Sequence, residues 1–204
     1  MHRFGFFIII LLMLFGLINF FVFTDIGENT PTSASLTQEP LTVTLLDPQL
    51  GSAMASTTII EFGDFACPFC RDADIILKEL AAKHPTTVRL VWKDFPNDAH
   101  NPLSSTLSYA GRCAQGLGKF EMFRAWAFGN QEKITRESLV DYLISLGVTN
   151  PNNCLADPST KAKVAHTIKQ GNSLEIDGTP YILINNKNYT GPITFEALEN
   201  IIKQ

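Results

Sequence analysis

The chain has 204 residues, enough for one domain with a sizeable core, and a net charge of -4 from 16 basic and 20 acidic residues. It has no basic stripe and no block of like charges, so no nucleic-acid partner is expected. Its four cysteines, an even number, are compatible with two disulfides, although spacing alone does not give the pairing.

The first element along the chain is an uncharged apolar run, FGFFIIILLMLFGLINFFVF, at residues 4–23. As a helix it is long enough to cross a bilayer. Arg3 precedes it and Asp25 follows it, which favours a cytoplasmic N-terminus. We therefore expect residues 1–24 to be a single-pass signal anchor in the cell membrane, with residues 25–204 on the extracytoplasmic (periplasmic) side. The alternative is a cleaved signal peptide, although the run exceeds the usual apolar stretch of about 7–15 residues.

Residues 25–40 are rich in Thr, Ser, Pro and Glu and lack apolar periodicity, which is typical of a flexible linker. The remaining chain, 41–204, alternates strand and helix patterns. The patterns predict strands at 41–46, 57–62 and 86–95, a helix from Pro68 to about Lys83, helices at about 102–156 and from Pro158, a hairpin at 181–190 turning at Asn186-Lys187, and a final helix at 195–202. Asn101-Pro102 is expected to open the first helix of the middle block. This order predicts an α/β domain with a helical insertion at about 102–156.

The segment EFGDFACPFC, at 61–70, holds two cysteines at the junction of a buried strand and a helix. Unpaired N–H groups at a helix N-terminus favour an anion, so we expect a lowered pKa for the Cys67 thiol. Cys70 lies one turn later on the same face, near enough to close a small disulfide ring. The pattern predicts thiol–disulfide exchange: Cys67 forms a mixed disulfide with a partner sulfur, and Cys70 resolves it.

Two other uses of this pair are less favoured. A zinc site needs a second close pair of ligands, but Cys113 and Cys154 are 41 residues apart. A purely structural Cys67–Cys70 bridge would constrain the unfolded chain little, because its loop is so short. No metal and no organic cofactor is expected.

EFGDFACPFCR resembles the active-site segment of DsbA-type thiol–disulfide oxidoreductases. DGTPYILINN, at 177–186, resembles the loop and strand that carry the cis-proline of that family. Together they extend the resemblance over roughly residues 41–204, and it implies a thioredoxin-like fold with an inserted helical subdomain. It also implies that Thr179-Pro180 faces the cysteines and that the backbone beside this proline pairs with the substrate peptide.

The dipeptide between the cysteines, Pro68-Phe69, is expected to shape the active site. Oxidising members of the family often have histidine at the position of Phe69. Phenylalanine donates neither a hydrogen bond nor charge to the Cys67 thiolate, so the disulfide should be less oxidising than with histidine.

Glu61 and Lys93 are charged residues within apolar strand patterns. Both could lie at strand ends facing water, or they could form a buried pair, since an unpaired buried charge is costly. The resemblance favours the pair, because family members carry an acid and a lysine at similar places. Glu61 and Lys93 are then expected to transfer protons as Cys70 changes redox state. Asp64 is expected to be solvated or to cap a helix.

Cys113 lies on the first helix of the predicted insertion, and Cys154 follows the third. In an oxidising compartment the simplest interpretation is a structural disulfide that clamps the insertion. In the chain-entropy description a loop of this size stabilises by roughly 3–4 kcal/mol. The alternatives are a second redox pair or two free buried thiols.

These features predict a membrane-anchored oxidoreductase that forms disulfides in exported proteins with cysteines. By analogy with the family, its own redox state would be restored by a membrane partner: a quinone-linked reoxidase for an oxidase, or an electron donor for a reductase or isomerase. Sequence does not separate these directions. The hypothesis from another class is a redox-inert thioredoxin-fold chaperone or binding module.

Overall fold

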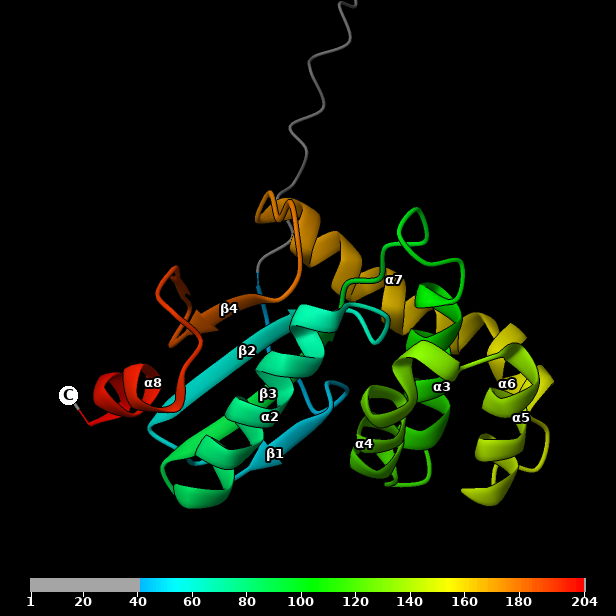
Figure 1. Cartoon of the computed structure of the whole chain (residues 1–204), viewed down its shortest axis with the longest axis horizontal. Coiled ribbons are helices and arrows are strands. Elements are labelled where there is room, and N and C mark those ends of the chain that lie inside the picture. The colour runs from blue at the N-terminus through cyan, green and yellow to red at the C-terminus, as the bar shows by residue number, and fades with distance from the viewer. Residues whose placement is uncertain (1–40, 204) are drawn as a thin grey trace, which may run out of the picture. The chain divides into compact units, whose positions relative to one another are not determined.

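The computed structural model describes residues 41–203, and Figure 1 shows this part of the chain as a sheet packed with helices, beside a group of further helices. Its elements are, in chain order, β1 (Gln49–Gly51), β2 (Thr57–Gly63), α2 (Pro68–Lys83), β3 (Val88–Asp94), α3 (Ser104–Gln115), α4 (Phe120–Asn130), the 3-10 turn η1 (Gln131–Lys133), α5 (Arg136–Ser145), α6 (Pro151–Ala156), α7 (Pro158–Ser173), β4 (Tyr181–Ile184), β5 (Lys187–Tyr189) and α8 (Phe195–Ile202). Within residues 41–203 the sheet has five strands in the order β1-β3-β2-β4-β5. Strands β2 and β3 are parallel and the other neighbours are antiparallel. The predicted α/β class is confirmed.

The β2–α2–β3 unit forms the centre of the sheet. Both strands are almost wholly buried, as expected for parallel strands covered on both faces. Ile59 and Leu90 pack on one face with the apolar residues of α2 and α8, whereas Ile60 and Val91 belong to the cluster on the other face. Helix α2 begins at Pro68 and ends at Lys83, so its predicted bounds are confirmed.

Helix α7 reaches the sheet because residue 171 is a glycine. A Cβ atom there would lie 2.5 Å from the ring of Phe95 and 3.4 Å from that of Phe62. Any larger residue would push the helix off the strands. The helix continues from the group of helices back to the sheet (Figure 1) and so connects the two parts.

The segment between β3 and α7 is helical, as predicted, and packs around its own aromatic core. Elements α3, α4, η1, α5 and α6 lie beside the sheet in Figure 1. Their core extends to Phe65 and to Trp92 of β3, and its members from the insertion include Leu107, Phe120, Phe123, Phe128, Leu139, Leu143 and Leu155. The rings of Phe65 and Trp92 stack with centroids 4.7 Å apart. The insertion therefore packs directly beneath the loop that leads to Cys67.

Three predicted boundaries are wrong. Residues 41–46 are not a strand: the N–H of Thr44 donates to Asp47 Oδ2 at 2.7 Å, and the N–H of Asp47 donates to Thr44 O at 3.1 Å, which closes a turn. The first strand is β1. Helix α3 begins at Ser104, because the Asn101 side chain caps the preceding turn by accepting from the N–H of Leu103.

The hairpin between β4 and β5 also turns one residue earlier than predicted. Asn185 and Asn186 occupy the turn, with φ angles of 49° and 63°. Asparagine tolerates this left-handed conformation better than most residues, which explains why these two residues take the turn.

Candidate active site at Cys67 and Cys70

Cys67 stands at the junction that the sequence predicted. Strand β2 ends at Gly63, and the N–H of Cys67 donates to Asp64 O at 3.0 Å within the connecting turn. Cys67 then caps α2, with Pro68 as its first helical residue. Cys67 is 8% exposed, Cys70 is fully buried, and both are free thiols. The structure therefore brings the two sulfurs together at a helix N-terminus in their reduced state.

The two thiols have opposite acidities. A hydrogen bond with Cys70 is the largest cause that lowers the pKa of the Cys67 thiol, and backbone N–H groups of Phe69 and Cys70 add to it, giving a pKa of about 5 although burial opposes them. Burial raises the pKa of the Cys70 thiol above its ordinary value, and its bond with Cys67 and the charge of Glu61 raise it further. Cys67 is therefore a thiolate at neutral pH and Cys70 keeps its proton, while the role of Cys67 as the nucleophile stays a prediction.

The loop before β4 lies against Cys67. The Thr179-Pro180 peptide bond is cis, and Thr179 O is 3.3 Å from Cys67 Sγ. Strand β4 is antiparallel to β2, which delivers this loop to the end of β2 where α2 begins. The predicted meeting of Thr179-Pro180 with the cysteines is therefore present in the structure, although the role of the loop in substrate binding stays a prediction.

Phe69 is an apolar side chain at the mouth of the site. It is 71% exposed, even though the cysteines on both sides of it are buried. Its ring is therefore an exposed apolar surface two residues after Cys67, and its role in shaping the active site stays a prediction.

The turn that carries Cys67 is held by a residue of the insertion. The Gln131 side chain, on η1, donates through Nε2 to Phe65 O and to Cys67 O, each at 2.8 Å. Sequence reasoning missed Gln131, because no local pattern indicates which backbone carbonyls an amide 60 residues away will contact.

The predicted Glu61–Lys93 pair is wrong. The register of β2 and β3 aligns Glu61 with Trp92 and Phe62 with Lys93. Because successive side chains point to opposite faces of a sheet, Glu61 and Lys93 lie on different faces. Lys93 is buried and donates to Asp47 Oδ1 at 2.8 Å, and also to Thr42 O and Gln170 Oε1. Burial lowers the pKa of Lys93.

The partner of Glu61 is an arginine of the insertion. Arg124, on α4, donates from Nη2 to Glu61 Oε2 at 2.7 Å and from Nε to Asp74 Oδ1. Burial is the main cause that raises the pKa of Glu61 to about 7, against the lowering effect of Arg124. Glu61 is thus fully buried and paired on the same face as the active site, but its role in proton transfer stays a prediction.

A local signal could have identified Arg124. It lies four residues after Phe120 and four before Phe128, so it interrupts the apolar stripe of a predicted helix. A lone arginine on such a stripe requires a buried acid. Glu61 was the available strand acid, and the two residues could have been matched on this ground.

Asp64 is a structural residue of the active-site turn, and the expectation that it is solvated is wrong. It is 1% exposed. Its carboxylate accepts from the N–H of Ala66 at 2.8 Å, the N–H of Asn97 at 3.1 Å and the hydroxyl of Ser104 at 2.8 Å. Asp64 therefore joins the turn before Cys67 to the start of α3.

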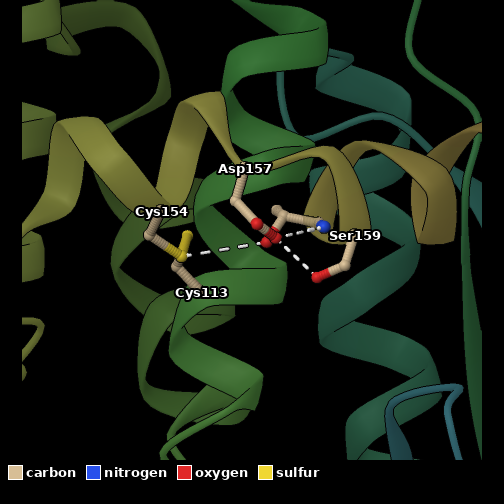
Figure 2. The surroundings of a disulfide bond; sticks show 5 residues. Cys113, Cys154, Asp157 and Ser159 are labelled. Atoms are coloured by element: carbon tan, nitrogen blue, oxygen red, sulfur yellow. Dashed lines mark hydrogen bonds between the residues drawn. A yellow bond between two sulfur atoms is a disulfide. The ribbon is translucent and has the colours of Figure 1, made fainter.

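Cys113 and Cys154 form a disulfide between α3 and α6, with an S–S distance of 2.00 Å (Figure 2). The bridge lies beside the start of α7. There Asp157 accepts from the N–H of Thr160 at 2.8 Å and from the hydroxyl of Ser159 at 2.5 Å. The disulfide thus fixes the short helix α6 at the point where the chain turns back toward the sheet.

The described part of the chain, residues 41–203, offers no candidate metal site and no candidate membrane span. In that part of the chain, no group of three or more His, Cys, Asp or Glu side chains is arranged to hold a metal ion. None of its helices is both long and apolar enough to span a bilayer. The predicted membrane span at residues 4–23 and the predicted linker at 25–40 lie outside the described residues.

Comparisons of sequence agree with this geometry. A family model described as thioredoxin matches residues 44–204. The chain is also 27% identical over 150 residues to the Na(+)/H(+) antiporter NhaA 3 of Salinispora tropica, a match that covers 72% of this chain and 23% of that protein. The Na(+)/H(+) antiporter NhaA 1 of Salinispora arenicola is 26% identical over 150 residues and is likewise covered over 23% of its length. The match thus spans less than a quarter of these curated relatives.

Solved structures share the fold over most of the described residues. A thioredoxin-like oxidoreductase from Silicibacter pomeroyi DSS-3 superposes with a TM-score of 0.67 at 22% identity, over 78% of this chain and 92% of that one. The alpha-DsbA1 protein of Wolbachia pipientis gives 0.67 at 18% identity, over 81% and 94%. BdbD from Bacillus subtilis gives 0.63 at 21% identity, over 78% and 91%. The family model covers most of the chain, which also holds two free thiols beside a cis-proline loop, and the chain therefore belongs to the thioredoxin family.

Proposed function

We propose that the protein is a DsbA-like thiol–disulfide oxidoreductase that forms disulfides in exported proteins by exchange through Cys67 and Cys70. The observation that carries the proposal is the Cys67 thiol, whose pKa of about 5 makes it a thiolate at neutral pH beside the protonated, buried Cys70. A low pKa makes Cys67 a good leaving group, which favours passing a disulfide on to a substrate.

The exchange proceeds in two displacements. A substrate thiolate attacks Cys67 Sγ of the oxidised enzyme, and the Cys67–Cys70 bond breaks with a proton taken up by the Cys70 sulfur. A second substrate thiolate then attacks the substrate sulfur of the mixed disulfide, and Cys67 leaves as a thiolate. The substrate dithiol has become a disulfide and the enzyme disulfide a dithiol, so two electrons have moved. A membrane redox partner would then remove them.

The direction of electron flow depends on two opposing features. Stabilising the Cys67 thiolate stabilises the reduced enzyme and so makes its disulfide more oxidising. The Phe69 side chain, in contrast, offers no charge or hydrogen bond to that thiolate. The value of about 5 for the pKa of Cys67 gives the oxidase hypothesis the stronger support. The alternative is a reductase or isomerase with the same residues.

The location is a second part of the proposal. We place the enzyme at the cell membrane through residues 4–23, with its active site on the extracytoplasmic side. The apolar run supports the anchor, and the Cys113–Cys154 disulfide supports an oxidising compartment. Exported proteins with cysteines are the substrates that such a position would supply.

The equilibrium redox potential of the full chain tests this function. Purified in mild detergent, the chain is equilibrated in glutathione buffers, alkylated, and all four cysteines are mapped by mass spectrometry. A Cys67–Cys70 potential above about -180 mV is expected for an oxidase. A value of about -230 mV or below would instead indicate a reductase, and failure to exchange at all would leave the binding-module hypothesis. Cys70→Ser is the control, since it should stop at the mixed disulfide.

A further inference from the structure

Arg124 joins the helical insertion to an acid beneath the active site. It comes from α4, is 1% exposed, and places its guanidinium 4.8 Å from the centre of the Trp92 ring. Its Nη2 donates to Glu61 Oε2 at 2.7 Å, and its Nε donates to Asp74 on α2. One cation of the insertion therefore binds two acids of the thioredoxin part.

One of the two carboxylate oxygens of Glu61 has no hydrogen-bond donor among the described residues. The residue is fully buried, and its Oε1 accepts no hydrogen bond from any residue in 41–203. Just after the strand that carries Glu61, the N–H of Asp64 donates to Cys70 Sγ at 3.4 Å, so Cys70 lies at the end of this strand, and the charge of Glu61 raises the pKa of its thiol. A buried acceptor without a donor is unfavourable. Its presence beside a thiol that must lose a proton points to a use in the reaction.

We propose that Arg124 is a positioning residue for the resolving step, because it binds Oε2 of Glu61 and so leaves Oε1 placed to accept the Cys70 proton. The inference rests on the proposed thiol exchange and concerns its other half, in which the reduced enzyme is reoxidised by the disulfide of a redox partner. Arg124 itself touches no reacting sulfur; it acts through Glu61.

The resolving step begins from a mixed disulfide between the protein and its redox partner. Cys67 has attacked the partner disulfide and is joined to one partner sulfur. Cys70 Sγ attacks Cys67 Sγ, the bond to the partner sulfur breaks, and that sulfur leaves as a thiolate. The proton of Cys70 passes to Glu61 Oε1. The enzyme dithiol is oxidised to a disulfide, and the partner disulfide is reduced to two thiols.

The charges around Glu61 set the pH at which it accepts this proton. Burial raises its pKa most, Arg124 lowers it, and Asp74 and the Cys67 thiolate raise it, which leaves a value of about 7. Glu61 is therefore available as a base near neutral pH, and it becomes unavailable as the pH falls below 7.

Two further charged side chains affect the pKa of Asp74 and, through Asp74, the pKa of Glu61. Lys78 on α2 lowers the pKa of Asp74 and Glu121 on α4 raises it, and these two side chains lie 3.4 Å apart. Removing the cation nearest to Glu61 should therefore raise the pKa of Glu61, and removing its acidic neighbour Asp74 should lower it.

The resolving rate as a function of pH tests the inference. The reduced full chain, in mild detergent, is mixed with excess oxidised glutathione and quenched in acid. Mass spectrometry then separates the Cys67–glutathione mixed disulfide from the Cys67–Cys70 disulfide. Between pH 5 and 9 we expect the wild-type rate to rise and to level off at or somewhat below pH 7, because the Cys67 thiolate that raises the pKa of Glu61 in the dithiol is absent from the mixed disulfide. In Arg124→Met the inflection should move up by at least about one unit, which lowers the rate at pH 6 about tenfold.

Arg112→Met is the matched control. Arg112 is another buried arginine of the insertion, 3% exposed, but its Nε donates to Asp94 at 2.6 Å rather than to Glu61. Loss of Arg112 should lower the free energy of unfolding, as loss of Arg124 should. The pH at which the resolving rate inflects should nevertheless stay at the wild-type value.

Asp74→Asn tests the same inference with the opposite sign, and it remains informative if Arg124→Met does not fold. The inflection should then move below that of the wild type. An unchanged inflection in any folded variant at Arg124 or Asp74 overturns the inference, and so does an equal shift in Arg112→Met. If the wild-type chain forms no mixed disulfide at all, the proposed function itself fails, which is a separate result.

Discussion

At the scale of single residues, the local environment gives two identical side chains, Cys67 and Cys70, different acidities. Cys67 begins α2, where backbone N–H groups and the Cys70 thiol stabilise its negative charge. Cys70 is fully buried beside Glu61, which disfavours its charge. Because only a thiolate attacks or leaves readily, Cys67 is the sulfur that we expect to react with a substrate.

This asymmetry makes the stability of the reduced chain depend on pH. The pKa of the Cys67 thiol is about 5 in the folded chain and near its ordinary value of 9.0 when unfolded. The thiolate therefore contributes stability that is fully present above pH 9 and is lost as the pH falls through 5. Relative to Cys67→Ala, reduced wild type should gain on the order of a few kcal/mol between pH 5 and pH 9.

Urea unfolding under reducing conditions, at a series of pH values, measures this gain. The oxidised wild type is the control, because its Cys67 does not titrate. A constant difference between reduced wild type and Cys67→Ala across this range would show that the Cys67 thiol is not acidic.

The positions of the active-site residues could be predicted from the sequence, whereas the partners of the buried charged residues could not. A strand, a turn and a proline around Cys67, and a proline before a strand at Thr179-Pro180, are local patterns, and the structure brings them together. Arg124 and Glu61 are 63 residues apart, so their pairing depends on how the insertion packs. The Glu61–Lys93 prediction failed because it ignored that one step of strand register reverses the face.

At the scale of elements, α6 shows how a short helix is kept in place. It has six residues, too few to be stable alone. Pro151 at its first turn, Leu155 in the core and the disulfide from Cys154 to Cys113 hold it. If this bridge is structural, Cys113→Ala/Cys154→Ala should lose about 3–4 kcal/mol of unfolding free energy in urea, because the unfolded chain gains loop entropy.

Two results would contradict that prediction. A loss below about 1 kcal/mol would show that packing, not the bridge, holds α6. Opening of Cys113–Cys154 in the same glutathione buffers that reduce Cys67–Cys70 would identify it as a second redox pair. Thiol exchange at Cys67 should persist in the double variant in either case, since the bridge lies within the insertion.

Most element bounds could be predicted, and the failures have a common cause. Helix α2 and strands β2 and β3 are specified by proline, apolar periodicity and β-branched residues within each segment. The alternation at 41–46 looked like a strand, but Asp47 closes a turn there and leaves Leu45 92% exposed. A side chain that bonds to the backbone a few residues away overrides a periodic pattern, and periodicity does not report it.

At the scale of the whole molecule, the proposed anchor can be tested by fractionation. The full chain should remain with membranes in high salt and at alkaline pH and should be released by detergent, because an apolar run of this length partitions into the bilayer. Deletion of residues 1–24 should release the chain as a soluble protein. Deletion of 25–40 is the control and should leave it in the membrane. Release of a shortened wild-type chain without detergent would indicate a cleaved signal peptide instead.

The two edges of the sheet bear on how readily the protein aggregates. Within the described residues, the edge strands β1 and β5 have three residues each, whereas the inner strands β2 and β3 have seven. Short edges offer few free backbone groups to an additional strand. The proposed function would bring this sheet into contact with unfolded chains, which offer many extended segments able to add to a sheet. Its own sheet should therefore neither trap such segments nor seed aggregation with a second copy.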